Sequence, residues 1–194
     1  MRILYVLERW PELSQTFVAE ELNALRELGC EVEVACVSAG NGPQSEIEST
    51  SFLEASSGRR ISSALQQLTV SPAATARQVL LEKAWPPPKG TGKLRGLLRL
   101  APLRDAALRA DHIHAHFATE AADIARLLSQ STQTPWSFTA HGADAYSDPV
   151  ALRANLRSAQ FARAASPHVA AQLKLADPTA RIIELPVAVA LELF

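Results

Sequence analysis

The sequence predicts an α/β fold in which a parallel sheet carries helices on both faces. Short apolar runs alternate with stretches of helical apolar spacing from residue 2 to 37, and again from residue 111 to 185. The first run, residues 2–7, is apolar without alternation, as in strands that are covered on both faces. Helix-start and helix-stop residues stand between the runs. These three observations together predict the fold class.

The first elements form a strand–helix–strand unit. After the strand at residues 2–7, Ser14 is in place to cap a helix. The helix has an apolar stripe at helical spacing, made by Val18, Leu22 and Leu25. Gly29 then suits a helix C-terminus, and residues 31–37 alternate as a strand does. This order is typical of a βαβ unit.

The same alternation returns in the second half of the chain. The predicted strands there are residues 111–116, 136–140, 161–165 and 181–185. The predicted helices are residues 119–131, residues 150–158 and a helix that begins at Ser166-Pro167. Strands that alternate with helices indicate a Rossmann-like sheet, which binds its ligands beyond the carboxyl ends of the strands.

We expect one domain over residues 1–194, with a variable insert at about 38–110. Residues 38–57 are rich in Gly, Ser, Pro, Asn and Glu, which indicates a surface loop. Helices are expected at 59–69 and 73–85, and a basic helix from Lys93 that is interrupted at Pro102.

The composition excludes several classes of protein. Of 194 residues, 47% are hydrophobic, 19 are basic, 20 are acidic and two are cysteine. A formal net charge of −1 argues against nucleic-acid binding, and two cysteines are too few for a disulfide scaffold. No stretch approaches the roughly 20 apolar residues of a membrane-spanning helix, and the apolar start is too short for a signal peptide. We therefore expect a cytoplasmic protein.

Charge is distributed unevenly along the chain. Residues 1–55 carry three basic and ten acidic side chains, residues 56–110 ten and two, and residues 111–194 six and eight. Within the basic part, residues 93–109 have an amphipathic pattern. Such a helix can lie on anionic lipid at the inner face of a membrane, or it can pack on the core with its basic side in solvent.

Three histidines, His112, His114 and His116, alternate with small or apolar residues. Period-two spacing places them on one face of a strand. Imidazoles bind zinc, but same-face neighbours lie roughly 6.6 Å apart along a strand, so three on one straight strand fit a single ion poorly. The alternative is a row of histidines at the edge of a cleft, with His116 nearest the carboxyl end.

His141 directly follows the strand at residues 136–140, and Asp144 comes three residues later. A neutral imidazole can exchange a hydrogen bond with a polar ligand and polarise it. Asp144 either orients that ring, binds a hydroxyl, or accepts backbone N–H groups of the turn. Because both residues follow a strand end, we predict His141 and Asp144 as catalytic residues.

Other polar residues begin the helices that follow strand ends. The loop after the first strand contains no glycine, which excludes a G-x-G-x-x-G dinucleotide site. Ser14 and Thr16 lie near the first-turn amides of its helix, where phosphate binds; simple capping is the alternative. Ser166 is interpreted first as the N-cap of its helix.

Four motifs in order carry a resemblance to a known family. They are W-P-E-L-S-Q-T-F (10–17), H-I-H-A-H-F-A (112–118), S-F-T-A-H-G-A-D (137–144) and A-R-A-A-S (162–166). The chain resembles the N-terminal domain of retaining family-4 glycosyltransferases, in particular the exopolysaccharide and colanic-acid-type subgroup. The resemblance covers nearly the whole chain except residues 38–95.

The resemblance implies the N-terminal, acceptor-side half of a GT-B fold. It implies transfer of a sugar from a nucleotide-sugar to a glycan or lipid-linked acceptor in polysaccharide biosynthesis, without a metal or other cofactor. His141 matches the family histidine beside the transferred sugar, and His116 matches a cleft-lining histidine. Ser14 and Thr16 match positions close to the donor phosphates.

Two further positions, Asp144 and Ser166, match cleft-edge residues of the family. The sequence departs from the family after Pro186, where alanines stand in place of the linker's Gly and Asp. We expect the family's C-terminal donor domain to be absent from this chain. Since the donor domain supplies groups to the reaction, we expect this chain alone to be inactive. Two alternatives stay open: a non-catalytic binding domain that needs a partner chain, and a small metal-dependent hydrolase built on His112, His114 and His116.

Overall fold

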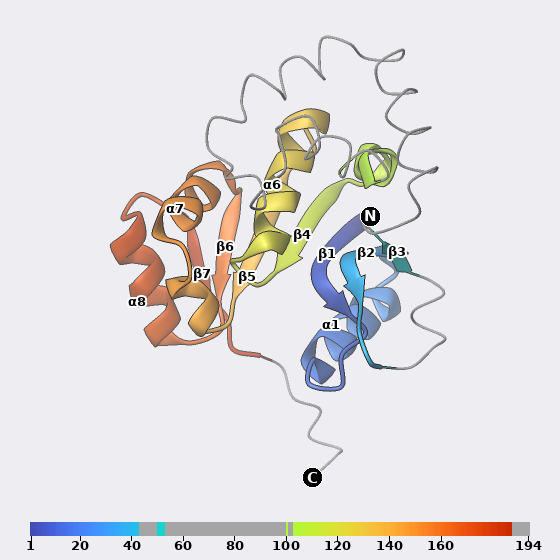
Figure 1. Cartoon of the computed structure of the whole chain (residues 1–194), viewed down its shortest axis with the longest axis horizontal. Helices are drawn as coiled ribbons and strands as arrows, with labels where there is room; N and C mark the ends of the chain where they lie inside the picture. The colour runs from blue at the N-terminus through green and yellow to red at the C-terminus, as the bar shows by residue number, and fades with distance from the viewer. Residues whose placement is uncertain (43–49, 53–99, 101–102, 188–194) are drawn as a thin grey trace.

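The fold is a parallel sheet of seven strands. The computed structural model describes residues 1–42, 50–52, 100 and 103–187, and the strand order is β3-β2-β1-β4-β5-β6-β7 (Figure 1). The strands are Arg2–Trp10 (β1), Glu31–Ala39 (β2), Thr50–Phe52 (β3), His112–His116 (β4), Trp136–Ala140 (β5), Phe161–Ala164 (β6) and Ile182–Glu184 (β7). All neighbouring strands pair in parallel. The predicted α/β class is confirmed.

Helices connect the strands as the sequence predicts. Their bounds are Thr16–Glu27 (α1), Glu120–Thr132 (α6), Pro149–Ser158 (α7) and Pro167–Ala176 (α8), with a 3₁₀ helix at Ala143–Tyr146 (η2). The short strand β3 lies within the predicted surface loop, where the sequence predicts no strand. The helices expected at 59–69 and 73–85 lie outside the described residues.

Local signals explain where three helices begin or end. Gly29 follows α1 with a φ of +80°, the left-handed conformation that glycine adopts readily at a helix C-terminus. Asp148 caps α7 by accepting from two backbone N–H groups, and Pro149 occupies the first turn. Ser166 caps α8 in the same way, accepting from Val169 N–H. The predicted cap at Ser166 is therefore present.

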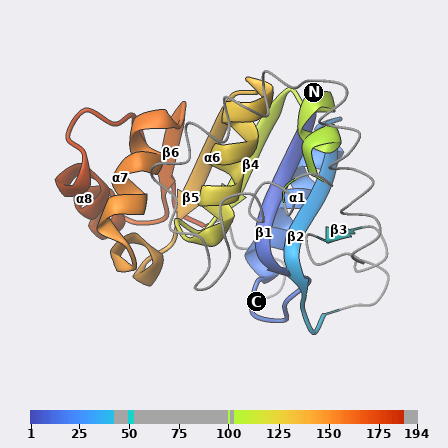
Figure 2. The same cartoon turned by 45° about the horizontal axis from the view of Figure 1, so that its top comes forward.

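The two faces of the sheet contact different helices. One core contains Leu4, Val6, Ile113 and Ala115 together with apolar residues of α6, while the other contains Ile3, Tyr5, Leu7, Val18 and Leu22. Successive strand residues thus alternate between an α6 face and an α1 face. Figure 2 shows α6 in front of the sheet and α1 behind β1 and β2.

A cavity of about 820 Å³ opens on the α1 face, beside the helix. Its lining crosses from α1 to β4, β5 and β6 and mixes aromatic with charged side chains, including Phe17, Glu21, His114, Phe161 and Arg163. The face that carries the histidines is therefore reachable from solvent beside α1.

Only part of the basic segment at 93–109 is described. Residues 103–109 are helical, and Leu103, Ala106 and Ala107 are buried in the same core as α6. At the end of this helix, Arg109 forms an ion pair with Glu33 at 3.3 Å. The described part therefore packs on the core with basic groups outward. Within the described residues, none of the helices is both long and apolar enough to cross a bilayer.

Candidate functional site

Two of the predicted site histidines meet at the carboxyl edge of the sheet. Strands β4 and β5 are neighbours with His116 in register with Thr139, so His141 emerges next to His116. The Nδ1 atom of His116 lies 3.0 Å from the Nε2 atom of His141, and the two rings stack with centroids 5.2 Å apart. His116 is fully buried, whereas His141 is half-buried. The arrangement links a surface imidazole to a buried one.

Aromatic rings enclose His141 on two sides. The rings of Phe17 and Phe117 each lie with their centroids 4.8 Å from that of His141. Phe117 has a φ of 74°, a conformation that is uncommon for a residue with a side chain and that turns the chain sharply after His116. Such strain is concentrated at functional sites. The His141 ring thus lies between two apolar side chains at the carboxyl edge of the sheet.

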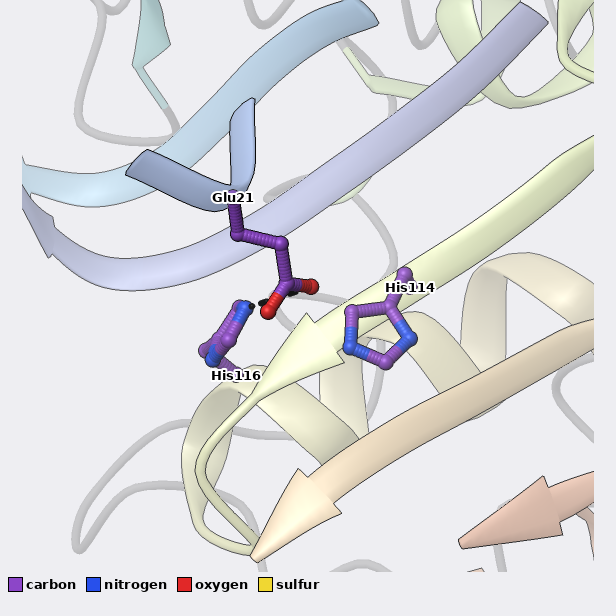
Figure 3. A group of neighbouring side chains, drawn as sticks. All are labelled: Glu21, His114 and His116. Atoms are coloured by element: carbon purple, nitrogen blue, oxygen red, sulfur yellow. Dashed lines mark ion pairs between the residues drawn. The ribbon is translucent and has the colours of Figure 1, made fainter. Parts of the chain in front are cut away.

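A half-buried carboxylate, that of Glu21 in α1, lies next to His116 of the histidine pair. Its Oε1 atom accepts a hydrogen bond from the Tyr5 hydroxyl at 2.7 Å, and its Oε2 atom accepts one from Arg163 Nη1 at 2.5 Å. The Nε2 atom of His116 lies 3.4 Å from Oε1, at ion-pair distance but outside regular hydrogen-bond geometry (Figure 3). Four elements, β1, α1, β4 and β6, therefore converge on this carboxylate.

The other two histidines of β4 pair with hydroxyl groups of β5. The Nδ1 and Nε2 atoms of His114 lie 2.8 Å from Ser137 Oγ and 3.0 Å from Thr139 Oγ1. The Nε2 atom of His112 lies 2.7 Å from the same Ser137 hydroxyl. The expectation that the three histidines share one strand face is thus met, and this row is held by hydrogen bonds to β5.

One group among the described residues has metal-ligand character, namely Glu21, His114 and His116, whose ligand atoms lie within 4.8 Å of one another. It does not fit a metal well. Both ring nitrogens of His114 are engaged by hydroxyls, and both carboxylate oxygens of Glu21 accept hydrogen bonds. The Arg163 guanidinium would also repel a cation. His112 does not belong to the group, so the geometry argues against a hydrolase built on the three histidines.

Asp144 holds the backbone of the His141 loop. Its carboxylate accepts from the backbone N–H groups of His141, at 3.0 and 3.1 Å, and of Gly142, at 2.6 Å. It also accepts from Ala118 N–H at 2.9 Å, which ties the end of β5 to the start of α6. Of the roles considered for Asp144, these contacts correspond to the backbone acceptor rather than to a partner of the His141 ring.

Among the described residues, Ser14 and Thr16 of the first loop form no hydrogen bond with the histidine pair. Helix α1 begins at Thr16 with Gln15 as N-cap, and no side chain caps its first turn. The expected cap by Ser14 is therefore wrong, because the chain enters the helix one residue later. Ser14 and Gln15 instead line a cavity of about 270 Å³ between the first loop and the start of α6. In it, the buried atoms Gln15 Oε1 and Thr119 Oγ1 lack a partner among the described residues.

Burial and close contacts set the protonation of the site. Burial raises the pKa of the Glu21 carboxyl, but the close contact with His116 Nε2 and the hydrogen bond from Tyr5 outweigh it, and the pKa falls below its ordinary value. Burial lowers the pKa of His141 to about 4, with Asp144 acting in the opposite direction. Burial likewise lowers the pKa of His114. The site therefore carries an ionised Glu21 and a neutral His141 at neutral pH.

A comparison with protein families identifies the fold's relatives. The model of the glycosyl transferase 4-like domain matches residues 14–184. The chain belongs to this family. No curated protein matches the sequence. The matched range of this glycosyl transferase 4-like domain contains His116, His141 and Glu21, and the family match supports transferase activity for the chain.

Sequence reasoning misses two residues of the site, Glu21 and Arg163. Glu21 is one of ten acidic residues in the first 55 and lies in a helix whose polar face is otherwise exposed. Arg163 carries a usable signal, since it is the one charged residue in the strand Phe-Ala-Arg-Ala. A charge in the middle of a covered strand requires a buried partner.

Proposed function

We propose that the chain is the acceptor-side domain of a retaining glycosyltransferase, which moves a hexose from a nucleotide-sugar to a glycan or lipid-linked acceptor in polysaccharide biosynthesis. The family match over residues 14–184 supports the transferase class. The observation that carries the proposal is the His116–His141 pair at the carboxyl edge of the sheet. Sheets of this kind bind ligands at that edge.

In this proposal, His141 contacts the transferred sugar. A half-buried neutral imidazole between two phenylalanine rings can exchange one hydrogen bond with a sugar hydroxyl, and it adds no charge at neutral pH. Asp144 acts through the backbone, because its three amide contacts fix where the His141 ring stands. Positioning of this kind is a large part of catalysis.

The first loop is proposed as the place where the donor phosphates approach. The N-terminus of α1 has no side-chain cap, so its first-turn N–H groups can meet an anion, with Ser14 and the Thr16 hydroxyl beside them. The Ser166 hydroxyl, in contrast, accepts from Val169 N–H as the cap of α8, so Ser166 is proposed only as a cleft-edge residue. A C-terminal donor domain would supply the remaining contacts to the nucleotide.

Nucleoside-diphosphate release tests the proposal. The 194-residue chain is incubated with UDP- and GDP-hexoses and polyprenyl-phosphate-linked acceptors, alone and mixed with a donor-binding domain of the same family. We expect release only from the mixture. Release by the chain alone would contradict the acceptor-side assignment. Acceptor binding without release in any mixture would favour a non-catalytic binding domain.

A further inference from the structure

The carboxylate and the two histidines form a chain of contacts that ends at the site. Glu21 Oε1 lies 3.4 Å from His116 Nε2, and His116 Nδ1 lies 3.0 Å from His141 Nε2. The two histidines share one hydrogen bond, between one ring nitrogen of each. The position of the proton on one ring therefore determines its position on the next.

The charges around His116 are already balanced without it. Glu21 is ionised, and the Arg163 guanidinium neutralises it at 2.5 Å. Because the His116 side chain is completely buried among aromatic rings, a second cation there would lack a counter-charge of its own. A His116 ring that carries a single proton avoids such an unpaired buried charge.

The carboxylate decides which nitrogen carries that proton. An unprotonated Nε2 would point its lone pair at an anionic oxygen 3.4 Å away, whereas an N–H there is attracted to it. With the proton on Nε2, the Nδ1 atom of His116 is an acceptor. The Nε2 atom of His141 must then donate across the 3.0 Å contact, which leaves His141 Nδ1 without a proton.

We propose that Glu21, held by Tyr5 and Arg163, fixes the His116–His141 pair in this one tautomer, so that His141 offers an unprotonated Nδ1 as a hydrogen-bond acceptor for a ligand hydroxyl. Glu21 is thus a positioning residue that acts through His116. The nature of the ligand rests on the proposed function, but the tautomer is a property of the chain itself and is measurable without any substrate.

Replacing Glu21 by glutamine gives a sharp expectation. Arg163 has only donors, so it selects the carbonyl oxygen of the introduced amide at the position of Oε2. The amide NH₂ then takes the place of Oε1 and faces His116 Nε2. As a donor, it favours an unprotonated Nε2, which moves the His116 proton to Nδ1 and the His141 proton to its own Nδ1. Glu21→Gln therefore reverses both tautomers.

Long-range proton–nitrogen NMR correlations of histidine-labelled chain test the proposal, because they distinguish protonated from unprotonated ring nitrogens. His116→Gln and His141→Gln assign the signals, and the spectra are recorded at neutral pH. The groups that face the pair, and so contribute to its field, are Tyr5, Glu21, His114, Asp144 and Arg163. We expect His141 Nδ1 unprotonated in the original chain and protonated in Glu21→Gln.

The matched control is Glu20→Gln, on the same helix but exposed, which should leave both tautomers as they are. A protonated His141 Nδ1 in the original chain would overturn the proposal, and for this result the histidine variants serve only to assign the signals. An unchanged tautomer in a folded Glu21→Gln would overturn it as well. The predicted tautomers in a chain that supports no sugar transfer would contradict the proposed function but not this inference.

Discussion

The Nδ1 atom of His116 and the Nε2 atom of His141 lie 3.0 Å apart, although the two residues leave different strands. Parallel pairing of β4 with β5 brings both rings to one edge of the sheet. The buried ring in turn contacts Glu21, whose carboxylate is held by Arg163 from β6. A half-exposed imidazole is thereby joined to a partly buried charge pair.

Removing the acceptor at Asp144 should loosen the loop that positions His141. Asp144→Asn keeps the side-chain size but replaces one acceptor oxygen by a donor, which then faces a backbone N–H group. We expect a loss of about 1–3 kcal/mol in the free energy of unfolding, measured by urea denaturation. Asp105→Asn, at an exposed position, is the matched control and should cost nothing measurable. Equal stability of the two variants would contradict the role assigned to Asp144.

The two serines at helix starts should differ in their effect on stability. Ser166→Ala removes the acceptor for Val169 N–H and should cost about 1 kcal/mol in the free energy of unfolding. Ser14→Ala should leave it unchanged, because Gln15 is the N-cap of α1 and Ser14 is exposed. Thermal or urea unfolding of both variants checks this. A larger cost for Ser14→Ala would restore the capping role that the structure removes.

The unfolding free energy should fall on mild acidification. Burial lowers the pKa of His141 from 6.5 to about 4, and burial lowers the pKa values of His112 and His114 as well. Between about pH 6.5 and 4 the unfolded chain therefore binds protons that the folded chain does not, so this stability is present above that window and is lost as pH falls through it. Glu21 adds a further loss below its ordinary pKa of 4.5.

Replacing one of these histidines measures its contribution to the pH dependence of the unfolding free energy. In His141→Gln, the unfolding free energy should fall less steeply between about pH 6.5 and 4 than in the original chain. Some of the fall should persist, because His112 and His114 remain. Urea unfolding midpoints at several pH values measure this slope. An identical slope in the original chain and the variant would show that His141 is not held in its neutral form.

Much of the fold can be predicted because it depends on local patterns. Strand β5 begins and ends at the predicted residues, and the Ser166-Pro167 start of α8 follows from its cap. Strand β3 could not be predicted, since three residues in a polar loop carry no alternation and it forms only by pairing with β2. The prediction at Ser14 is wrong because a capping residue type says nothing about the turn that precedes the helix.

The sequence predicts the two histidines of the site but not the charged residues that contact them. The carboxyl ends of β4 and β5 point to His116 and His141, because strand ends follow from the alternation. Glu21 and Arg163 are 142 residues apart, and only the three-dimensional path of β6 past α1 brings them together. The same holds for Tyr5, whose hydroxyl meets Glu21 across the sheet–helix interface.

The central claim is that His141 contacts the sugar during transfer. Replacing His141 in the chain mixed with a donor-binding domain tests this claim most directly. Nucleoside-diphosphate release is measured for His141→Gln and for His112→Gln, which lies at the opposite end of β4, each mixed with the donor-binding domain. We expect His141→Gln to lower kcat by about 10²-fold or more. His112→Gln should stay close to the original chain. Equal turnover of His141→Gln and the original chain would contradict the account.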